Sequence, residues 1–334
     1  MFPSRPLLGN RIRLNWLALV MYGVVALVLA TRTLYTAWDD ANYIRHFQGE
    51  GDQDLPWWQY LIEEPVWKYY ASFLGAGLGP EIALRVTILA STFIFLAASA
   101  VLARGAWVFV LLAFLVDSAL ATQMYYNQVR QGFAFSVFLA LAAIRVPPYI
   151  AALTGSAFHT SLLAIVPCAL MAQVTPGRRV LLAGTLAIIF CGVFYLQSKL
   201  GTLDLGRRTS TYYTEGTLTL FYYVVMLPLY AVAIAAAAPD RDADRDQRIW
   251  YHMALLFTVL ALSLTLVHEA AGRLMYLASA MVMIALGRNM HQTRGKVGGV
   301  WWLLMLAVIV VNEARKTHFA EESWFGRWAA ILLH

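Results

Sequence analysis

The sequence predicts an all-α polytopic membrane protein, and its composition and apolar runs carry this prediction. Of 334 residues, 60% are hydrophobic and 13% are charged, and the mean hydropathy is +0.62. An ordinary soluble domain has about 25% charged residues. Apolar runs long enough to cross a bilayer recur along the whole chain. The runs are continuous, whereas the strands of a membrane β-barrel alternate in hydrophobicity.

The charge pattern and the cysteines exclude several classes of protein. The net charge is +6, but the basic residues are scattered between apolar segments, so a nucleic-acid partner is not expected. Cys168 and Cys191 both lie in apolar runs, which argues against a disulfide framework. No clustered metal-ligand spacing occurs, so we expect neither a metal nor a cofactor. The basic N-terminus precedes an apolar run without an obvious cleavage site, which predicts a retained first helix.

Eight membrane spans are clear from hydropathy. They lie near 14–32, 81–103, 105–123, 179–197, 218–238, 249–267, 272–287 and 299–313. The basic N-terminus belongs in the cytoplasm by the positive-inside rule. Counting from both ends, the segment 131–172 must then cross three times. We predict a helix ending near Arg145, a short helix from Pro147 to about Phe158, and another from His159 to about Ala172.

The resulting architecture is one integral membrane domain over residues 1–334. It is a helical bundle of about eleven spans, two of them short helices that are tilted or re-entrant because a full span needs about 20 residues. Residues 33–80 form an outer loop that contributes to a site. The segment 318–334 is either an interfacial tail helix or a further partial span.

In this topology the unusual polar residues gather at the outer face. Five segments contribute them: Asp39, Tyr43 and Glu64; Asn127, Arg130 and Gln131; His159; Arg207 and Arg208; and His268, Glu269 and Arg273. Polar groups at membrane depth are functional candidates because their burial is costly.

Several of these polar groups also have a structural interpretation, and Arg207 and Arg208 can simply be a solvated pair in a loop. Arg130 can reach the interface as a snorkelling side chain, and His159 can sit at a helix tip. Asp39 can cap the end of the first helix. Glu269 and Arg273 are spaced i, i+4 and can form a structural pair.

The clustered arginines nevertheless favour an anionic ligand. Arginine offers a planar, permanently charged fork that suits phosphate. A lipid diphosphate fits this position, with its tail in the bilayer and its head group at the outer rim.

Three short motifs follow one another in the chain: Asp39…Tyr43…Glu64-Pro65, then Asn127-x-x-Arg130-Gln131-x-x-Ala134, then Ala157-Phe158-His159-x-Ser161. Together they resemble the EpsG family, which comprises Wzy-type polymerases of exopolysaccharide and O-antigen synthesis. The resemblance spans roughly residues 35–165. It implies a glycosyltransferase C-like fold in the bacterial cytoplasmic membrane. It also implies transfer of a growing glycan from undecaprenyl diphosphate onto a lipid-linked repeat unit at the outer face.

Residue roles follow from the resemblance together with the predicted site. We expect Arg130 and Arg273 to clamp diphosphate with Arg207 or Arg208 assisting, in a metal-independent reaction. We expect His159 to be the general base or to position the acceptor. Asp39 and Glu64 would bind sugar hydroxyls, with Asp39 a second candidate for the base. The remaining predicted substrate contacts are Tyr43, Asn127, Gln131, His268 and Glu269. Expected protein partners are a flippase and a chain-length regulator.

Two other functions compete with polymerisation. A membrane O-acyltransferase that modifies glycans would draw its acyl donor from the cytoplasm, so its catalytic histidine should face inward, whereas His159 is predicted to face outward. A flippase or transporter of lipid-linked oligosaccharides usually has internal repeats and charges near the midplane. Here the charges gather at one face.

Overall fold

The structure is a computed structural model that describes residues 15–37, 39–50, 64–116, 124–173, 227–239, 243–265 and 272–290. Every element in these ranges is helical, and no strand occurs among them. The prediction of an all-α protein is therefore confirmed for the described part of the chain. The predicted spans 179–197 and 299–313 and the tail 318–334 lie outside the described residues.

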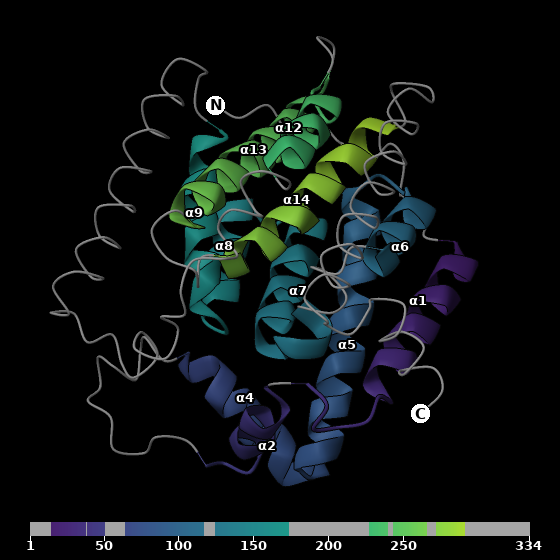
Figure 1. Cartoon of the computed structure of the whole chain (residues 1–334), viewed down its shortest axis with the longest axis vertical. Coiled ribbons are helices and arrows are strands. Elements are labelled where there is room, and N and C mark those ends of the chain that lie inside the picture. Colours follow the sequence, from purple (N-terminus) through teal and green to yellow (C-terminus); the bar gives the residue numbers. More distant parts are fainter. Residues whose placement is uncertain are drawn as a thin grey trace, which may run out of the picture.

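The helices form a bundle (Figure 1). In chain order they are α1 (Trp16–Ala30), α2 (Asp40–Phe47), α4 (Pro65–Leu78), α5 (Pro80–Leu102), α6 (Trp107–Val116), α7 (Val129–Ala143), α8 (Pro148–Ser156), the 3₁₀ helix η2 (Thr160–Ala164), α9 (Ile165–Met171), α12 (Leu227–Ala236), α13 (Arg245–Thr265) and α14 (Gly272–Met290).

Helix α5 is the central strut of the bundle and contacts α1, α2, α4, α6 and α7. Its 23 residues make it about 35 Å long, enough for a bilayer core of about 30 Å. Among the described residues it alone has the length and composition of a membrane span. Shorter apolar helices cover Trp16–Ala30, Val129–Ala143, Thr160–Met171 and Leu274–Asn289. The predicted bundle of about eleven spans is therefore not confirmed.

The two short helices predicted within 131–172 are confirmed. Helix α7 ends at Ala143, and Arg145 then takes a left-handed φ of 74° before the two prolines. Proline cannot continue a helix but suits its first turn, and α8 begins at Pro148. The next helical segment, η2 followed by α9, runs from Thr160 to Met171 with His159 as its N-cap.

The described residues of the segment 33–80, predicted as an outer loop, include the helices α2 and α4. Both were missed because they are short and surrounded by polar residues, so neither produces an apolar run. Their backbones touch at Gly75, where a Cβ would lie 1.8 Å from the carbonyl oxygen of Phe47. Only glycine permits this approach. The close packing holds α4 against α2, and both helices lie beside the N-terminal part of α5, as Figure 1 shows.

The surface of α1 has the polarity expected of a helix in lipid. Trp16, Val20, Val24 and Leu27 are exposed along one side, whereas Tyr22 is fully buried on the other. Continuous exposed apolar surface is unusual for a soluble protein and typical of a membrane-facing one.

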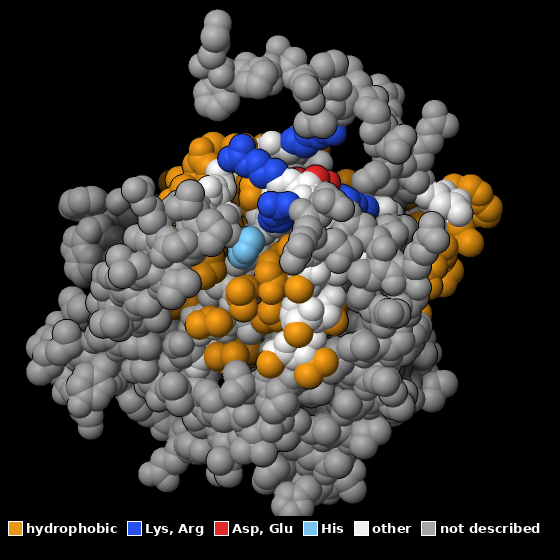
Figure 2. Space-filling view, turned by 90° about the horizontal axis from the view of Figure 1, so that it is seen from above, with side chains coloured by type: hydrophobic (Ala, Val, Ile, Leu, Met, Phe, Trp, Pro, Cys, Tyr) orange, Lys and Arg blue, Asp and Glu red, His pale blue; other side chains and the backbone are white. Residues whose placement is uncertain are grey.

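Polar side chains collect at the two opposite ends of the bundle. At one end Arg104 forms an ion pair with Asp244, and Arg288 forms one with Asp246. Arg288 Nη1 also donates a hydrogen bond of 2.8 Å to the backbone carbonyl of Leu102. Burial raises the pKa of the Asp244 carboxyl, but hydrogen bonds from the Gln247 backbone and from Arg104 outweigh it and lower that pKa. Figure 2 looks onto this end and shows basic side chains gathered beside an acidic group.

The other end holds α2, the start of α4 and the start of α7 (Figure 1). The predicted topology assigns Glu64 and Arg130, which belong to this end, to the outer face of the membrane. Which end faces the cytoplasm remains a prediction.

Candidate functional site

Three segments that are distant in sequence meet at one ionic cluster. Glu64 is the N-cap residue of α4, Arg130 lies in the first turn of α7, and His159 and Thr160 connect α8 to η2. The Glu64 Oε2 atom lies 2.9 Å from Arg130 Nη1. The Oε1 atom accepts hydrogen bonds from the Thr160 backbone N–H at 2.9 Å and from its hydroxyl at 3.3 Å. The site therefore joins groups that the sequence analysis placed together.

Burial differs sharply within this cluster. Glu64 is 1% exposed, whereas Arg130 and His159 are 15% and 17% exposed. A buried carboxylate is costly unless it is paired and hydrogen-bonded, and here Arg130 and Thr160 provide both. Glu64 is thus buried beneath the surface, whereas the side chains of Arg130 and His159 remain partly exposed.

Glu64 also has an uncommon backbone conformation. Its φ of 61° and ψ of 61° are left-handed, which is rare for a residue with a side chain. Pro65 follows as the first residue of α4 and fixes the direction of the helix. Strained residues persist only where surrounding contacts hold them, and they are common at functional sites.

Three buried donor atoms in the cluster, Arg130 Nε, Arg130 Nη1 and Ser161 Oγ, make no hydrogen bond among the described residues, although all three are inaccessible to solvent. Of these, only Nη1 has an ion-pair contact, with Glu64. Buried polar atoms are nearly always satisfied, so such exceptions call for an explanation. Both side chains can donate to an anion, which is consistent with a ligand that carries phosphate.

The imidazole of His159 is held by its own chain. Its Nδ1 atom accepts a hydrogen bond of 3.2 Å from the Ser161 backbone N–H, which caps η2. The same Nδ1 lies 3.6 Å from Glu64 Oε1, beyond hydrogen-bonding distance for an uncharged ring. His159 is therefore both a helix cap and a member of the cluster.

Aromatic rings pack around the indole of Trp67 and connect the helices that carry the site. Trp67 is fully buried and lies edge-on to Tyr43 of α2 and Phe133 of α7, with ring centroids 6.1 Å and 6.0 Å away. Phe133 in turn contacts Phe158, next to His159, at 5.3 Å. Tyr43 is 5% exposed, so its ring belongs to this packing.

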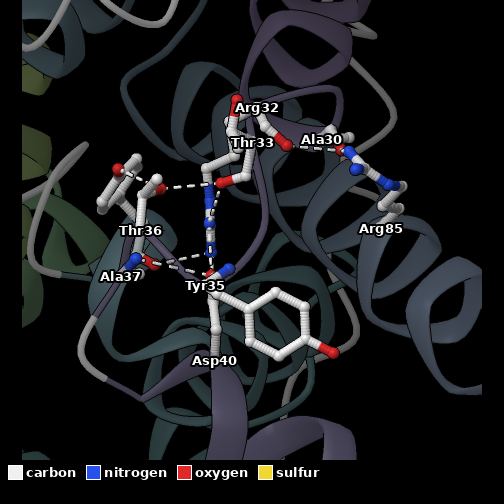
Figure 3. A network of polar contacts seen from close by, with 9 residues as sticks. Ala30, Arg32, Thr33, Tyr35, Thr36, Ala37, Asp40 and Arg85 are labelled. Atoms are coloured by element: carbon white, nitrogen blue, oxygen red, sulfur yellow. Dashed lines mark hydrogen bonds and ion pairs between the residues drawn. The ribbon is translucent and has the colours of Figure 1, made fainter.

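A buried ion pair between Arg32 and Asp40 lies at the same end of the molecule and was missed from the sequence. The guanidinium donates two hydrogen bonds to the Asp40 carboxylate, at 2.6 Å and 2.5 Å, as Figure 3 shows. The side chains are 1% and 0% exposed. Asp40 Oδ2 also accepts from the Tyr35 N–H at 2.9 Å. Together these bonds fix the chain between α1 and α2.

Arg85 of α5 braces the same corner. Its Nη1 donates to the backbone carbonyls of Ala30 at 2.7 Å and Arg32 at 2.9 Å (Figure 3). Asp39 is the functional carboxylate that the sequence predicts in this region. Asp39 is the half-buried N-cap residue of α2 and makes no side-chain capping bond. The signal for the ion pair was an arginine at the end of the first apolar run, eight residues before Asp40.

The Arg32–Asp40 ion pair is connected to α7, the helix that carries Arg130, by contacts between Arg32 and Tyr126. Arg32 Nη2 donates to the Tyr126 carbonyl at 3.1 Å, and its guanidinium lies 4.4 Å from the centre of the Tyr126 ring. Tyr126 belongs to a π-helical turn over 124–127 that leads into α7. At Gly132 a Cβ would lie 2.5 Å from the Met124 carbonyl oxygen, so this turn and α7 are closely packed.

The other predicted site residues are placed as follows. Asn127 is in the π-helical turn, and Gln131 is buried in α7 at 1% exposure. Arg273 lies in the first turn of α14, but its side chain is outside what the structure describes. Arg207, Arg208, His268 and Glu269 also lie outside the described residues. The described part of the chain contains no group of three or more His, Cys, Asp or Glu side chains suited to a metal. Metal independence remains a prediction.

Comparison with known proteins identifies a family for nearly the whole chain. The sequence model of the EpsG family matches residues 15–325. No curated protein and no solved structure matches the chain significantly.

Proposed function

The chain belongs to the EpsG family, and from this premise we propose that it is a polysaccharide polymerase of exopolysaccharide synthesis. The donor is the growing glycan on undecaprenyl diphosphate. The acceptor is the next lipid-linked repeat unit, which reacts at the outer face of the bacterial cytoplasmic membrane. Its partners are these lipid-linked oligosaccharides, and a flippase and a chain-length regulator would act before and beside it.

In the proposed reaction, an acceptor hydroxyl oxygen attacks the anomeric carbon of the donor. The bond between that carbon and the diphosphate oxygen breaks, and its electron pair moves onto the diphosphate. Diphosphate is a good leaving group, so the protein mainly has to stabilise the charge that develops on it. A guanidinium offers paired N–H groups for this purpose.

The observation that supports this proposal best is the ionic cluster around Arg130. Glu64 holds one edge of the guanidinium at 2.9 Å, and the buried Nε has no partner among the described residues. An anchored arginine with a remaining donor is preorganised for an anion, because little side-chain freedom is lost on binding.

In the proposed site, Glu64 acts mainly as a positioning residue because its carboxylate faces protein groups. His159 transfers a proton or positions the acceptor. Sugar contacts by Glu64, Asp39, Tyr43, Asn127 and Gln131 remain predictions.

The residues outside the described part of the chain complete the proposed site. Arg273 joins Arg130 at the diphosphate, Arg207 or Arg208 assists, and His268 and Glu269 contact the substrate.

The direct test is to replace Arg130 with Lys and with Ala in a polymer-producing host. The matched control is Arg45→Lys and Arg45→Ala, because Arg45 is exposed on α2 and bonds to Asn42. Membrane levels are checked, and lipid-linked products are resolved by length. We expect single repeat units to accumulate in both Arg130 variants, since Lys lacks the planar fork. Full-length polymer from both Arg130 variants would reduce Arg130 to an interface anchor and remove the centre of the site.

The rival functions are separated when the acyl content of the products and the side of the membrane on which repeat units accumulate are measured in the same variants. Loss of an O-acyltransferase would leave full-length polymer that lacks acyl groups. Loss of a flippase would trap repeat units on the cytoplasmic side, whereas loss of a polymerase would leave them at the outer face.

A further inference from the structure

We propose that His159 acts in the neutral form as a hydrogen-bond donor from Nε2 to the diphosphate, and that it is not the general base. This rests on the proposed function, excludes the role of general base that it leaves open for His159, and assigns the ring to the diphosphate instead. The inference comes from the contacts of the other ring nitrogen, Nδ1, which the structure shows directly.

The Nδ1 atom is committed as an acceptor. The Ser161 backbone N–H lies 3.2 Å from Nδ1. A backbone N–H can only donate, so Nδ1 must present a lone pair. A neutral imidazole has a single N–H, which then lies on Nε2. A ring in this state cannot take a proton at Nε2, whereas a general base needs a lone pair on the nitrogen that faces the substrate.

The carboxylate beside His159 does not reverse this assignment. In a Ser-His-Asp triad, the carboxylate accepts Nδ1–H and leaves Nε2 free to act as the base. Here Glu64 Oε1 lies 3.6 Å from Nδ1 and already accepts two hydrogen bonds from Thr160. The other oxygen faces Arg130 at 2.9 Å. Glu64 is therefore arranged to hold the loop and the arginine, and its Oε1 lies beyond hydrogen-bonding distance of Nδ1.

An Nε2–H donor suits the same charge as Arg130. As the anomeric carbon–oxygen bond breaks, its electron pair moves to the diphosphate, and a hydrogen bond from Nε2–H to that group strengthens with the growing charge. The proton of the attacking hydroxyl passes to a carboxylate, for which Asp39 is the candidate. No proton moves to His159.

Two isosteric replacements of His159 separate a donor from a base. In His159→Gln the amide nitrogen reaches about the position of Nε2 and can donate but cannot take a proton. In His159→Asn the amide oxygen can still cap η2, but nothing occupies the Nε2 position. We expect Gln to retain polymerisation within about tenfold of wild type, and Asn and Ala to lose about a hundredfold or more, as for a lost oxyanion donor. Loss in Gln as deep as in Ala would overturn the proposal.

A measurement that does not depend on activity keeps the inference separate from the proposed function. Nitrogen NMR on the full-length protein labelled with ¹⁵N-histidine shows which ring nitrogen carries the proton, and His159→Gln assigns the signal. His252 is an internal control with the opposite arrangement, because its Nδ1 lies 2.6 Å from the Arg248 carbonyl, which can only accept. We expect the proton on Nε2 in His159 and on Nδ1 in His252.

The outcomes of the two experiments are distinct. A proton on Nδ1 of His159 would overturn the tautomer and with it the proposal, whatever the enzyme makes. Failure of the wild-type protein to lengthen lipid-linked glycans would instead overturn the proposed function, and the NMR result would still describe the ring.

Discussion

At the scale of single residues, Glu64 holds the parts of the site in place through its contacts with Arg130 and Thr160. It is the least exposed member of the ionic cluster and contacts both other segments. Removing one partner of a buried ion pair leaves the other without compensation, which costs about 3–5 kcal/mol in a fully buried case. The cost should be smaller here because Arg130 is partly exposed.

The change Glu64→Gln tests this role, because it keeps the shape of the side chain and removes its charge. We expect a lower apparent melting temperature in detergent and a loss of long polymer, since Arg130 is no longer held. The control is Glu81→Gln, an exposed residue in the first turn of α5. Equal behaviour of the two variants would show that the pairing with Arg130 is dispensable.

The residues of this cluster were predictable from the sequence, but the Arg32–Asp40 pair was not. Glu64, Arg130 and His159 stand out because they are polar or charged residues at the ends of apolar runs in a mostly hydrophobic chain. Asp39 and Asp40 are adjacent, and the sequence offers no sign of which one faces inward. That choice depends on how the turn before α2 is built, where Tyr35 takes a left-handed φ of 67°.

At the scale of elements, close backbone contact between α2 and α4 positions Glu64 at the start of α4. Gly75 makes the contact, and Gly77 on the same helix has nothing within 4 Å of its Cβ position. These glycines form a matched pair in one element.

We predict that Gly75→Ala lowers the stability by about 1–3 kcal/mol, as overpacking does, and reduces polymer formation. Gly77→Ala should be neutral or stabilise by up to about 1 kcal/mol, because alanine favours helix. Thermal unfolding of the purified proteins measures both. A tolerated alanine at Gly75 would contradict the close approach of the two helices.

The Arg32–Asp40 pair links a second set of elements, since it joins the α1–α2 corner to the turn that precedes α7. We predict that Arg32→Lys destabilises the protein by about 3–5 kcal/mol, because lysine cannot form both bonds to a buried carboxylate. Arg45→Lys, on the exposed side of α2, should change stability by less than about 0.5 kcal/mol. Comparable unfolding curves for the two variants would argue against a structural role for the pair.

Element boundaries were predictable only where the chemistry marks them. Pro147 and Pro148 marked the break after α7 and the start of α8, and the predicted short helices agree with those found. Helices α2 and α4 have no such apolar run, and tertiary contacts through Trp67 and Gly75 stabilise them instead. Such contacts between distant segments leave no local pattern in the sequence.

At the scale of the whole molecule, the separation of two polar ends is the feature that a membrane would explain. One end carries the Arg104–Asp244 and Arg288–Asp246 pairs, and the other carries Glu64, Arg130 and His159. Apolar side chains such as Val20 and Val24 are exposed between them.

Labelling from one side of the membrane tests the orientation of these ends. Single cysteines are introduced as Asn42→Cys on α2 and Arg245→Cys at the start of α13, both exposed positions, in a protein whose Cys168 and Cys191 are replaced by alanine. A maleimide that cannot cross the cytoplasmic membrane should label position 42 in spheroplasts and position 245 only after lysis. The reverse pattern would leave the bundle intact but turn the proposed site toward the cytoplasm, where a flipped repeat unit could not reach it. Labelling of both positions from the same side would contradict a bundle whose polar ends lie on opposite faces.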